Sequence, residues 1–95
     1  MTGTTRSSEG LDIRRRKALF RSWHRGMREV DLILGSFADA EIGNLTDAEI
    51  EQYERLLDIP DAELLSWITG ERPVPAEHDM EILGRVLAFR QAMTF

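Results

Sequence analysis

The chain has 95 residues, no cysteine and a formal net charge of −5. A chain of this length builds one modest hydrophobic core, and the absence of cysteine excludes a disulfide framework, a zinc finger and thiol catalysis. No apolar run reaches the roughly 18 residues of a membrane span, and the start of the chain lacks the apolar segment of a signal peptide. We therefore expect a bacterial cytoplasmic protein.

Charge is distributed unevenly along the chain. Residues 1–30 carry eight basic and three acidic residues, a balance of +5, whereas residues 31–95 carry four basic and fourteen acidic residues, a balance of −10. Such polarity steers and orients an approaching partner, although it says little about the fold.

Residues 1–10 are polar and show no hydrophobic period, so we predict a disordered tail, followed by a single helical domain over residues 11–95. The first helix begins at Leu11 and ends near His24 or Arg25. Its apolar side is predicted from the spacing of Leu11, Ile13, Ala18, Phe20 and Trp23. Gly26 suits the left-handed position just after a helix, where a Cβ atom is costly.

The second helix is predicted over residues 27–42. Gly35 interrupts it, and because glycine inside a helix costs about 1 kcal/mol relative to alanine, we expect a close helix–helix contact there. The third helix begins at a capping box, in which the Thr46 hydroxyl and the Glu49 carboxylate each accept a hydrogen bond from the other residue's backbone amide.

Pro60 ends the third helix and suits the first turn of a short fourth helix, which stops at Gly70. The last helix is predicted over residues 76–93. Because no segment alternates as a strand does and the connections are short, the pattern predicts an all-α fold, a compact five-helix bundle.

The segment Arg25-Gly26-Met27-Arg28-Glu29 lies where the first two helices meet, and it holds three charges in five residues. A helix corner explains the glycine but not this charge density. Arginine suits carboxylates and carbonyls at interfaces, and methionine adapts to a partner's groove. We therefore predict that this segment binds a protein partner, together with His24 and Arg21. We also expect Arg25 and Glu29 to be at least partly exposed in the free protein. Gly26 should have positive φ, or lie so close to the partner that a side chain cannot fit there.

Other candidate sites are weaker. The basic run over residues 14–17 is most simply a solvated helix face, with an acidic protein partner or nucleic acid as alternatives. His24 and His78 do not have metal-binding spacing, and no carboxylate pair is singled out for acid–base catalysis. No glycine-rich phosphate loop is present. We expect no catalytic residues, no metal site and no nucleotide or flavin bound by this chain alone.

The charged segment also carries a family resemblance. Arg25, Gly26 and Glu29 match the R-G-x-x-E hallmark of the succinate dehydrogenase assembly factors that promote flavinylation, the SdhE-like proteins. Residues 56–67 are similar to that family's D-x-x-D-x-x-L-x-x-W region. The resemblance covers roughly residues 11–92 with order and spacing kept, and it implies the family's five-helix bundle.

The resemblance implies an assembly factor with a chaperone-like role and no catalysis of its own. Such a factor binds the flavoprotein subunit of succinate dehydrogenase and favours covalent attachment of FAD to a histidine of that subunit. It implies that FAD belongs to the partner and that this chain binds no cofactor. We expect a monomer when the chain is free. Whether a fumarate reductase flavoprotein is a further client stays open.

Two alternatives from other classes also stay open. One is a small nucleic-acid-binding regulator that uses the arginine-rich helix, which a steep salt dependence of DNA binding would identify. The other is an interaction module of the antitoxin type with an unrelated partner, which co-purification with the flavoprotein would exclude.

Overall fold

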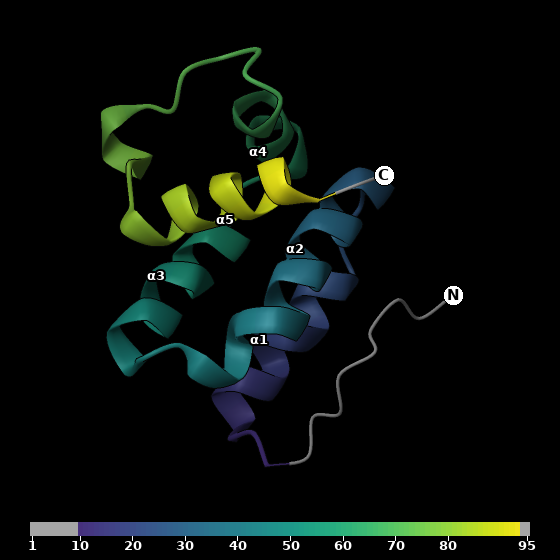
Figure 1. Cartoon of the computed structure of the whole chain (residues 1–95), viewed down its shortest axis with the longest axis vertical. Helices are drawn as coiled ribbons and strands as arrows, with labels where there is room; N and C mark the ends of the chain where they lie inside the picture. The colour runs from purple at the N-terminus through teal and green to yellow at the C-terminus, as the bar shows by residue number, and fades with distance from the viewer. Residues whose placement is uncertain (1–9, 94–95) are drawn as a thin grey trace.

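The computed structural model describes residues 10–93, so the tail predicted over residues 1–10 lies outside the described residues except for Gly10. Within that range the chain is all-α, as predicted, and has no strand (Figure 1). The helices are α1 (Ile13–Trp23), α2 (Arg28–Glu41), α3 (Asp47–Leu57), α4 (Asp61–Ile68) and α5 (Glu81–Ala92), with single 3-10 turns at Ile42–Asn44 and Ala76–His78.

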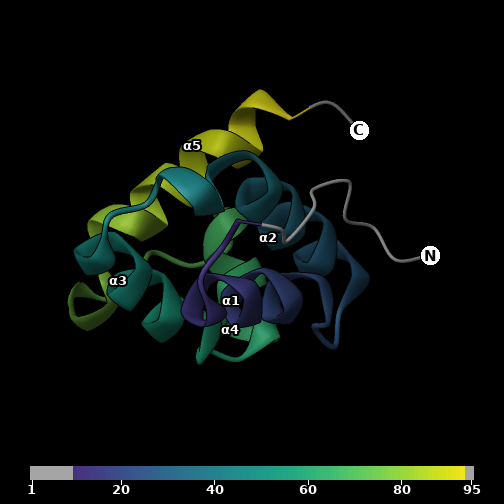
Figure 2. The ribbon, with the colours of Figure 1, turned by 90° about the horizontal axis from the view of Figure 1, so that it is seen from below.

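Helix α2 is the central element of the bundle. It packs beside α1 and against α4, and α5 lies across α2 and α3 (Figures 1 and 2). The spacing of its apolar residues turns one side of the helix inward. Six of its residues are buried: Val30, Ile33, Leu34, Gly35, Phe37 and Ala38. The N-terminus of α2 is thereby held where α1, α3 and α4 converge.

The starts of α1 and α3 are capped by local side-chain hydrogen bonds. The predicted capping box at the start of α3 is confirmed: the Glu49 amide donates to Thr46 Oγ1 at 3.1 Å, and the Thr46 amide donates to Glu49 Oε1 at 2.8 Å. Asp12 was not predicted as a cap, yet its carboxylate accepts a hydrogen bond from the Arg15 amide at 2.8 Å and caps α1. Gly70 has φ +80° directly after the C-cap of α4, which confirms it as the stop of that helix.

Two predicted helix starts are wrong. Pro60 is the N-cap residue of α4 and lies one place before its first turn. The last helix begins at Glu81, because Asp79 and Met80 have non-helical backbone angles that separate it from the 3-10 turn at residues 76–78. Met80 packs against the core, so residues 79–80 follow the core surface before α5 begins.

The apolar side of α1 also differs from the prediction. Leu11, Ala18 and Leu19 are buried, whereas Ile13 and Phe20 are 69% and 62% exposed. At about 100° per residue, Ile13 and Phe20 lie on the opposite side of the helix from Ala18 and Leu19. Two large apolar side chains of α1 therefore face outward.

The close helix contact predicted at Gly35 is confirmed. A Cβ atom there would lie 2.2 Å from Trp23 Cδ2, because the indole ring lies flat against this part of α2. The Trp23 Nε1–H donates to Asp39 Oδ1 at 3.1 Å, which fixes the ring in place. Glycine at this position thus sets how closely α1 approaches α2.

We expect Gly35→Ala to destabilise the fold by about 1–3 kcal/mol, the usual cost of overpacking, because a rigid ring occupies the space that the methyl group needs. Gly84→Ala is the matched control. Gly84 lies inside α5, and outside the adjoining helix backbone no atom lies within 4 Å of the added Cβ. The substitution should therefore stabilise the fold by up to about 1 kcal/mol through helix propensity. Urea unfolding of both variants tests this, and equal effects would contradict it.

The core contains one buried polar pair. The Tyr53 hydroxyl and Ser22 Oγ lie 2.6 Å apart, and both residues have 0% exposure. Ser22 Oγ also reaches the Ala18 carbonyl at 2.8 Å, and the Tyr53 hydroxyl reaches the Leu34 carbonyl at 3.2 Å. Whichever hydroxyl donates to the other, both stay hydrogen-bonded, which buried polar groups require. The pair links α3 to α1 and α2.

Burial raises the pKa of Tyr53 above its ordinary value of 10.0, outweighing the opposite effect of the Ser22 hydrogen bond. A pKa raised in the folded state means that this group's contribution to stability is complete below about pH 10 and is lost as pH rises further. Tyr53 is the single tyrosine of the chain. We therefore expect tyrosinate absorbance and loss of helical circular dichroism to appear together on alkaline titration. Tyrosinate forming near pH 10 with intact helices would disprove this.

Candidate partner-binding site

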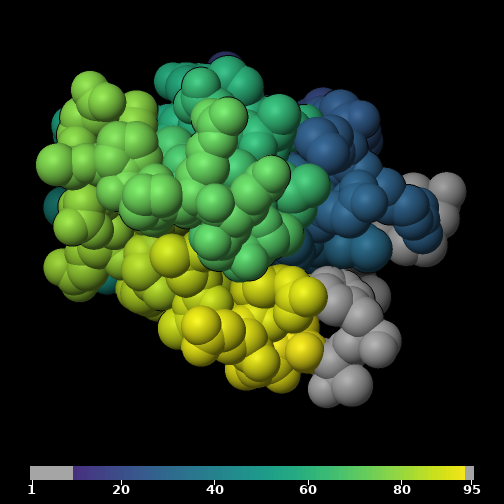
Figure 3. Space-filling model, turned by 90° about the horizontal axis from the view of Figure 1, so that it is seen from above, coloured from purple at the N-terminus to yellow at the C-terminus, as the bar shows by residue number. Residues whose placement is uncertain are grey.

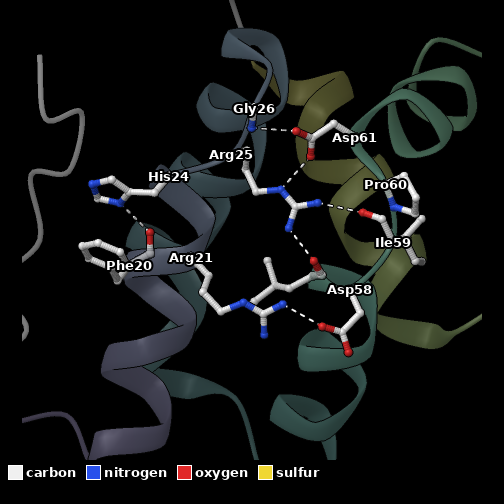
Figure 4. A pocket seen from close by; sticks show the side chains of 10 residues that line it. Phe20, Arg21, His24, Arg25, Gly26, Asp58, Ile59, Pro60 and Asp61 are labelled. Atoms are coloured by element: carbon white, nitrogen blue, oxygen red, sulfur yellow. Dashed lines mark hydrogen bonds and ion pairs between the residues drawn. The ribbon is translucent and has the colours of Figure 1, made fainter.

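The segment that joins α1 to α2 is held by side chains from distant parts of the chain. Residues 24–27 form the connection, with His24 as the C-cap of α1 and Met27 as the N-cap of α2. The corner between α3 and α4 packs against it. Figure 4 shows how Asp58, Ile59, Pro60 and Asp61 face Arg21, Arg25 and Gly26 across a groove of about 390 Å³.

Arg25 lies inside this corner with its side chain only 10% exposed. Its Nε–H donates to Asp61 Oδ1 at 2.7 Å, and its two terminal nitrogens donate to the carbonyls of Leu57 and Ile59. Those carbonyls lie at and just after the end of α3, where helical partners are missing. The planar guanidinium matches three acceptors at once, which a lysine ammonium on a flexible chain does not do.

Asp61 is the second anchor, and its side chain is 15% exposed. Its Oδ2 accepts hydrogen bonds from the amides of Gly26 at 2.8 Å and Met27 at 3.2 Å. The Arg25 amide donates to Asp31 Oδ1 on the other side. One carboxylate from α4 and one from α2 therefore fix the backbone of the connection. We call these contacts of Arg25, Asp61 and Asp31 the corner clamp.

Two predictions about this segment need correction. Arg25 was expected to be at least partly exposed, but only 10% of its side chain is, because Asp61, 36 residues further along the chain, supplies a partner. Of the two alternatives for Gly26, positive φ is wrong, because among the described residues only Gly10 and Gly70 have it. A close approach of the partner at Gly26 stays a prediction. A Cβ atom at Gly26 would instead lie 3.3 Å from Asp61 Oδ2, against the carboxylate that its own amide binds.

The remaining predicted site residues lie around the clamp. Arg21 forms an ion pair with Asp58 at 2.7 Å at the surface. The exposed His24 ring stacks on Phe20 with centroids 3.8 Å apart, and its Nδ1 bonds the Phe20 carbonyl. Met27 is half-buried against the core.

Arg28 and Glu29, in the first turn of α2, are both exposed, as we predicted for Glu29. No ion pair within residues 10–93 engages either side chain. The structure therefore brings Arg21, His24, Arg25 and Gly26 together along the groove. Glu29 instead lies at a separate hollow between α2 and α4.

Much of the basic run on α1 is bound within the chain. Arg14 pairs with Glu54 through two hydrogen bonds at 2.7 and 2.8 Å, and the pKa of Glu54 is lowered, chiefly by that hydrogen bonding. Arg15 bonds Asp12, Asp47 and the Leu45 carbonyl. The pattern of four adjacent cations therefore overstates the positive charge that is free to meet a partner.

In the part of the chain that the structure describes, no three His, Cys, Asp or Glu side chains gather as ligands for a metal ion. His78 packs near Trp67, with ring centroids 5.4 Å apart. None of the helices between residues 10 and 93 has the length and apolar character that crossing a bilayer requires.

The clamp predicts that Arg25→Ala destabilises the fold by about 3 kcal/mol, because removing one partner of a largely buried pair leaves the other unsatisfied. Arg21→Ala is the matched control one turn earlier on α1. It removes an exposed ion pair and should cost no more than about 1 kcal/mol. Equilibrium unfolding in urea measures both losses, and a small loss in both variants would refute the clamp.

Comparison with known proteins identifies the family. A family described as the flavinator of succinate dehydrogenase matches residues 16–90. The chain is 36% identical over 81 residues to an FAD assembly factor SdhE of Acetobacter pasteurianus, covering 85% of this chain and 74% of that protein.

Two mitochondrial proteins named succinate dehydrogenase assembly factor 2 are also similar. The protein of Dictyostelium discoideum is 44% identical over 69 residues, covering 73% of this chain and 49% of that protein. The protein of Mycosarcoma maydis is 36% identical over 83 residues, covering 85% of this chain and 35% of that protein. The chain thus spans half or less of these two longer relatives. The match over residues 16–90 shows that this chain belongs to the family of flavinators of succinate dehydrogenase.

Proposed function

We propose that this chain is an assembly factor that binds the flavoprotein subunit of succinate dehydrogenase and promotes the covalent attachment of FAD to that subunit. Family membership supports the proposal, because the match over residues 16–90 includes both α1–α2 and α3–α4 corners. The three relatives are named as assembly factors for FAD or for succinate dehydrogenase, which also supports the proposal.

The observation that carries the proposal is the fixed corner. The clamp holds the start of α2 rigidly, so Arg28 and Glu29 extend from a preformed surface and lose little conformational entropy on binding. His24, Arg21 and Met27 flank them. We propose that these five residues contact the client, while Arg25 and Gly26 give the surface its shape.

The proposed role needs no catalytic group on this chain. The new bond joins a histidine of the client to the flavin that the client holds, so this chain contributes positioning and charge. Fixed geometry and cations placed near developing negative charge both lower such a barrier. In this proposal the chain binds no FAD itself and works as a bacterial cytoplasmic protein. Stoichiometric flavin in the purified chain would contradict it.

A nucleic-acid-binding role receives less support. Arg14, Arg15 and Arg21 are bound to carboxylates of their own chain. Phosphate binding needs free cations, and the affinity grows with each phosphate that is neutralised. The sequence pI of about 5.0 is also far below that of a dedicated nucleic-acid binder.

We expect Arg28→Ala and Glu29→Ala to leave the free energy of unfolding within about 0.5 kcal/mol of the wild type, as exposed positions usually do. Each should nevertheless weaken client binding, because loss of a charged interface contact costs about 2–5 kcal/mol, or roughly thirty-fold and more in affinity. The measurement is flavin fluorescence of the flavoprotein band in a denaturing gel, from cells in which the variant replaces the wild-type chain.

The exposed Arg72, in the loop after α4, supplies the control variant Arg72→Ala, which should flavinylate the client normally. If Arg28→Ala and Glu29→Ala also give normal flavin fluorescence, the binding surface does not lie at the start of α2. If all three variants and the wild type give none, the proposed function itself fails.

A further inference from the structure

Beside Glu29 lies a hollow of about 250 Å³ between α2 and α4, at the C-terminal end of α5. Figure 3 shows the face of the molecule on which these helices, blue, green and yellow, meet. The walls are mainly apolar and are formed by Leu32, Ile33, Leu65 and Ile68, with Thr69 and Arg90 completing them. Helical spacing explains the arrangement, because positions i, i+3 and i+4 share one side of a helix.

The apolar walls of this hollow are only partly covered by the chain. Leu32, Leu65 and Ile68 are half-buried, whereas Ile33 beneath them is 3% exposed. Covering such open apolar surface with an apolar group lowers the free energy, because it removes that surface from water. The hollow is smaller than the about 300–1,000 Å³ of typical small-molecule sites. Its size and lining therefore fit a single apolar side chain better than a flavin or another cofactor.

The charged residues at the rim of the hollow indicate which polar groups accompany the apolar side chain that would fill it. The exposed carboxylate of Glu29 has no ion pair among the described residues. Arg90, which also lines the hollow, is already engaged in an interaction. The complementary occupant therefore brings a cation or an N–H donor next to its apolar side chain.

We propose that this hollow is an anchor subsite for the client flavoprotein. It receives one apolar side chain of the client, and Glu29 accepts a hydrogen bond from a cationic or N–H group beside it. The inference rests on the proposed function and adds the chemistry of the client segment. Interfaces commonly concentrate their binding energy in such an apolar anchor with a polar rim. The hollow adjoins the proposed surface because Glu29 belongs to both.

The test fills the hollow from outside the core. Thr69 is exposed, so Thr69→Trp can place its ring over the apolar walls without displacing buried atoms. Leu32→Ala removes part of one wall and serves as the second variant. Ala48→Trp is the matched control, because Ala48 is exposed on α3, which does not line the hollow. Calorimetric titration of each full-length variant with the purified flavoprotein subunit gives the affinity, and thermal melts report folding.

We expect Thr69→Trp and Leu32→Ala each to weaken binding at least tenfold, with Ala48→Trp unchanged and all three chains folded. If the wild type binds and both hollow variants bind equally well, the anchor subsite is wrong while the proposed function stands. If the wild type itself does not bind the subunit, both fail.

A second copy of this chain is the remaining occupant to test. Its exposed Phe20 on α1 could enter the hollow. Sedimentation of the free chain that shows a dimer, dissolved by Thr69→Trp, would assign the hollow to self-association and overturn the proposal.

Discussion

The structure depends on one ion pair between Arg25 and Asp61. The carboxylate bonds the guanidinium with one oxygen and two backbone amides, those of Gly26 and Met27, with the other. The guanidinium satisfies two carbonyls at the end of α3. Burying charge is costly unless every polar atom is satisfied, and here the hydrogen bonds meet that condition. A single side chain thus ties the α1–α2 corner to the α3–α4 corner.

This arrangement divides the R-G-x-x-E segment into two parts. The Arg25 side chain is turned into the fold and the Gly26 amide is bound by Asp61, whereas Arg28 and Glu29 extend outward from the first turn of α2. Asp61 belongs to the D-x-x-D region near residue 60, so two sequence motifs that lie far apart in the chain meet in one set of contacts.

Local chemistry made much of the fold predictable from the sequence. The capping box at Thr46 and the stop at Gly70 each follow from a few neighbouring residues, and a glycine inside a helix predicted the close contact at Gly35 without identifying Trp23 as its partner. The burial of Arg25 does not, because its partner lies in another helix and the sequence gives no pairing. The predicted start of the last helix, at residue 76, is too early for a similar reason. Met80 packs against the core, and this tertiary contact interrupts a pattern that is locally helical. Ile13 and Phe20 are apolar but exposed, so apolar character alone does not show which side of a helix faces the core.

Backbone hydrogen exchange at Gly26 tests the clamp most directly. Gly26 is an exposed residue in a connecting segment, so without the clamp its amide should exchange as freely as an unstructured one. Bonded to Asp61, the amide should be protected in the free wild-type chain and should lose protection in Asp61→Ala when that variant is still folded. A Gly26 amide that exchanges at the unstructured rate in the wild type would contradict a preformed corner and the account built on it.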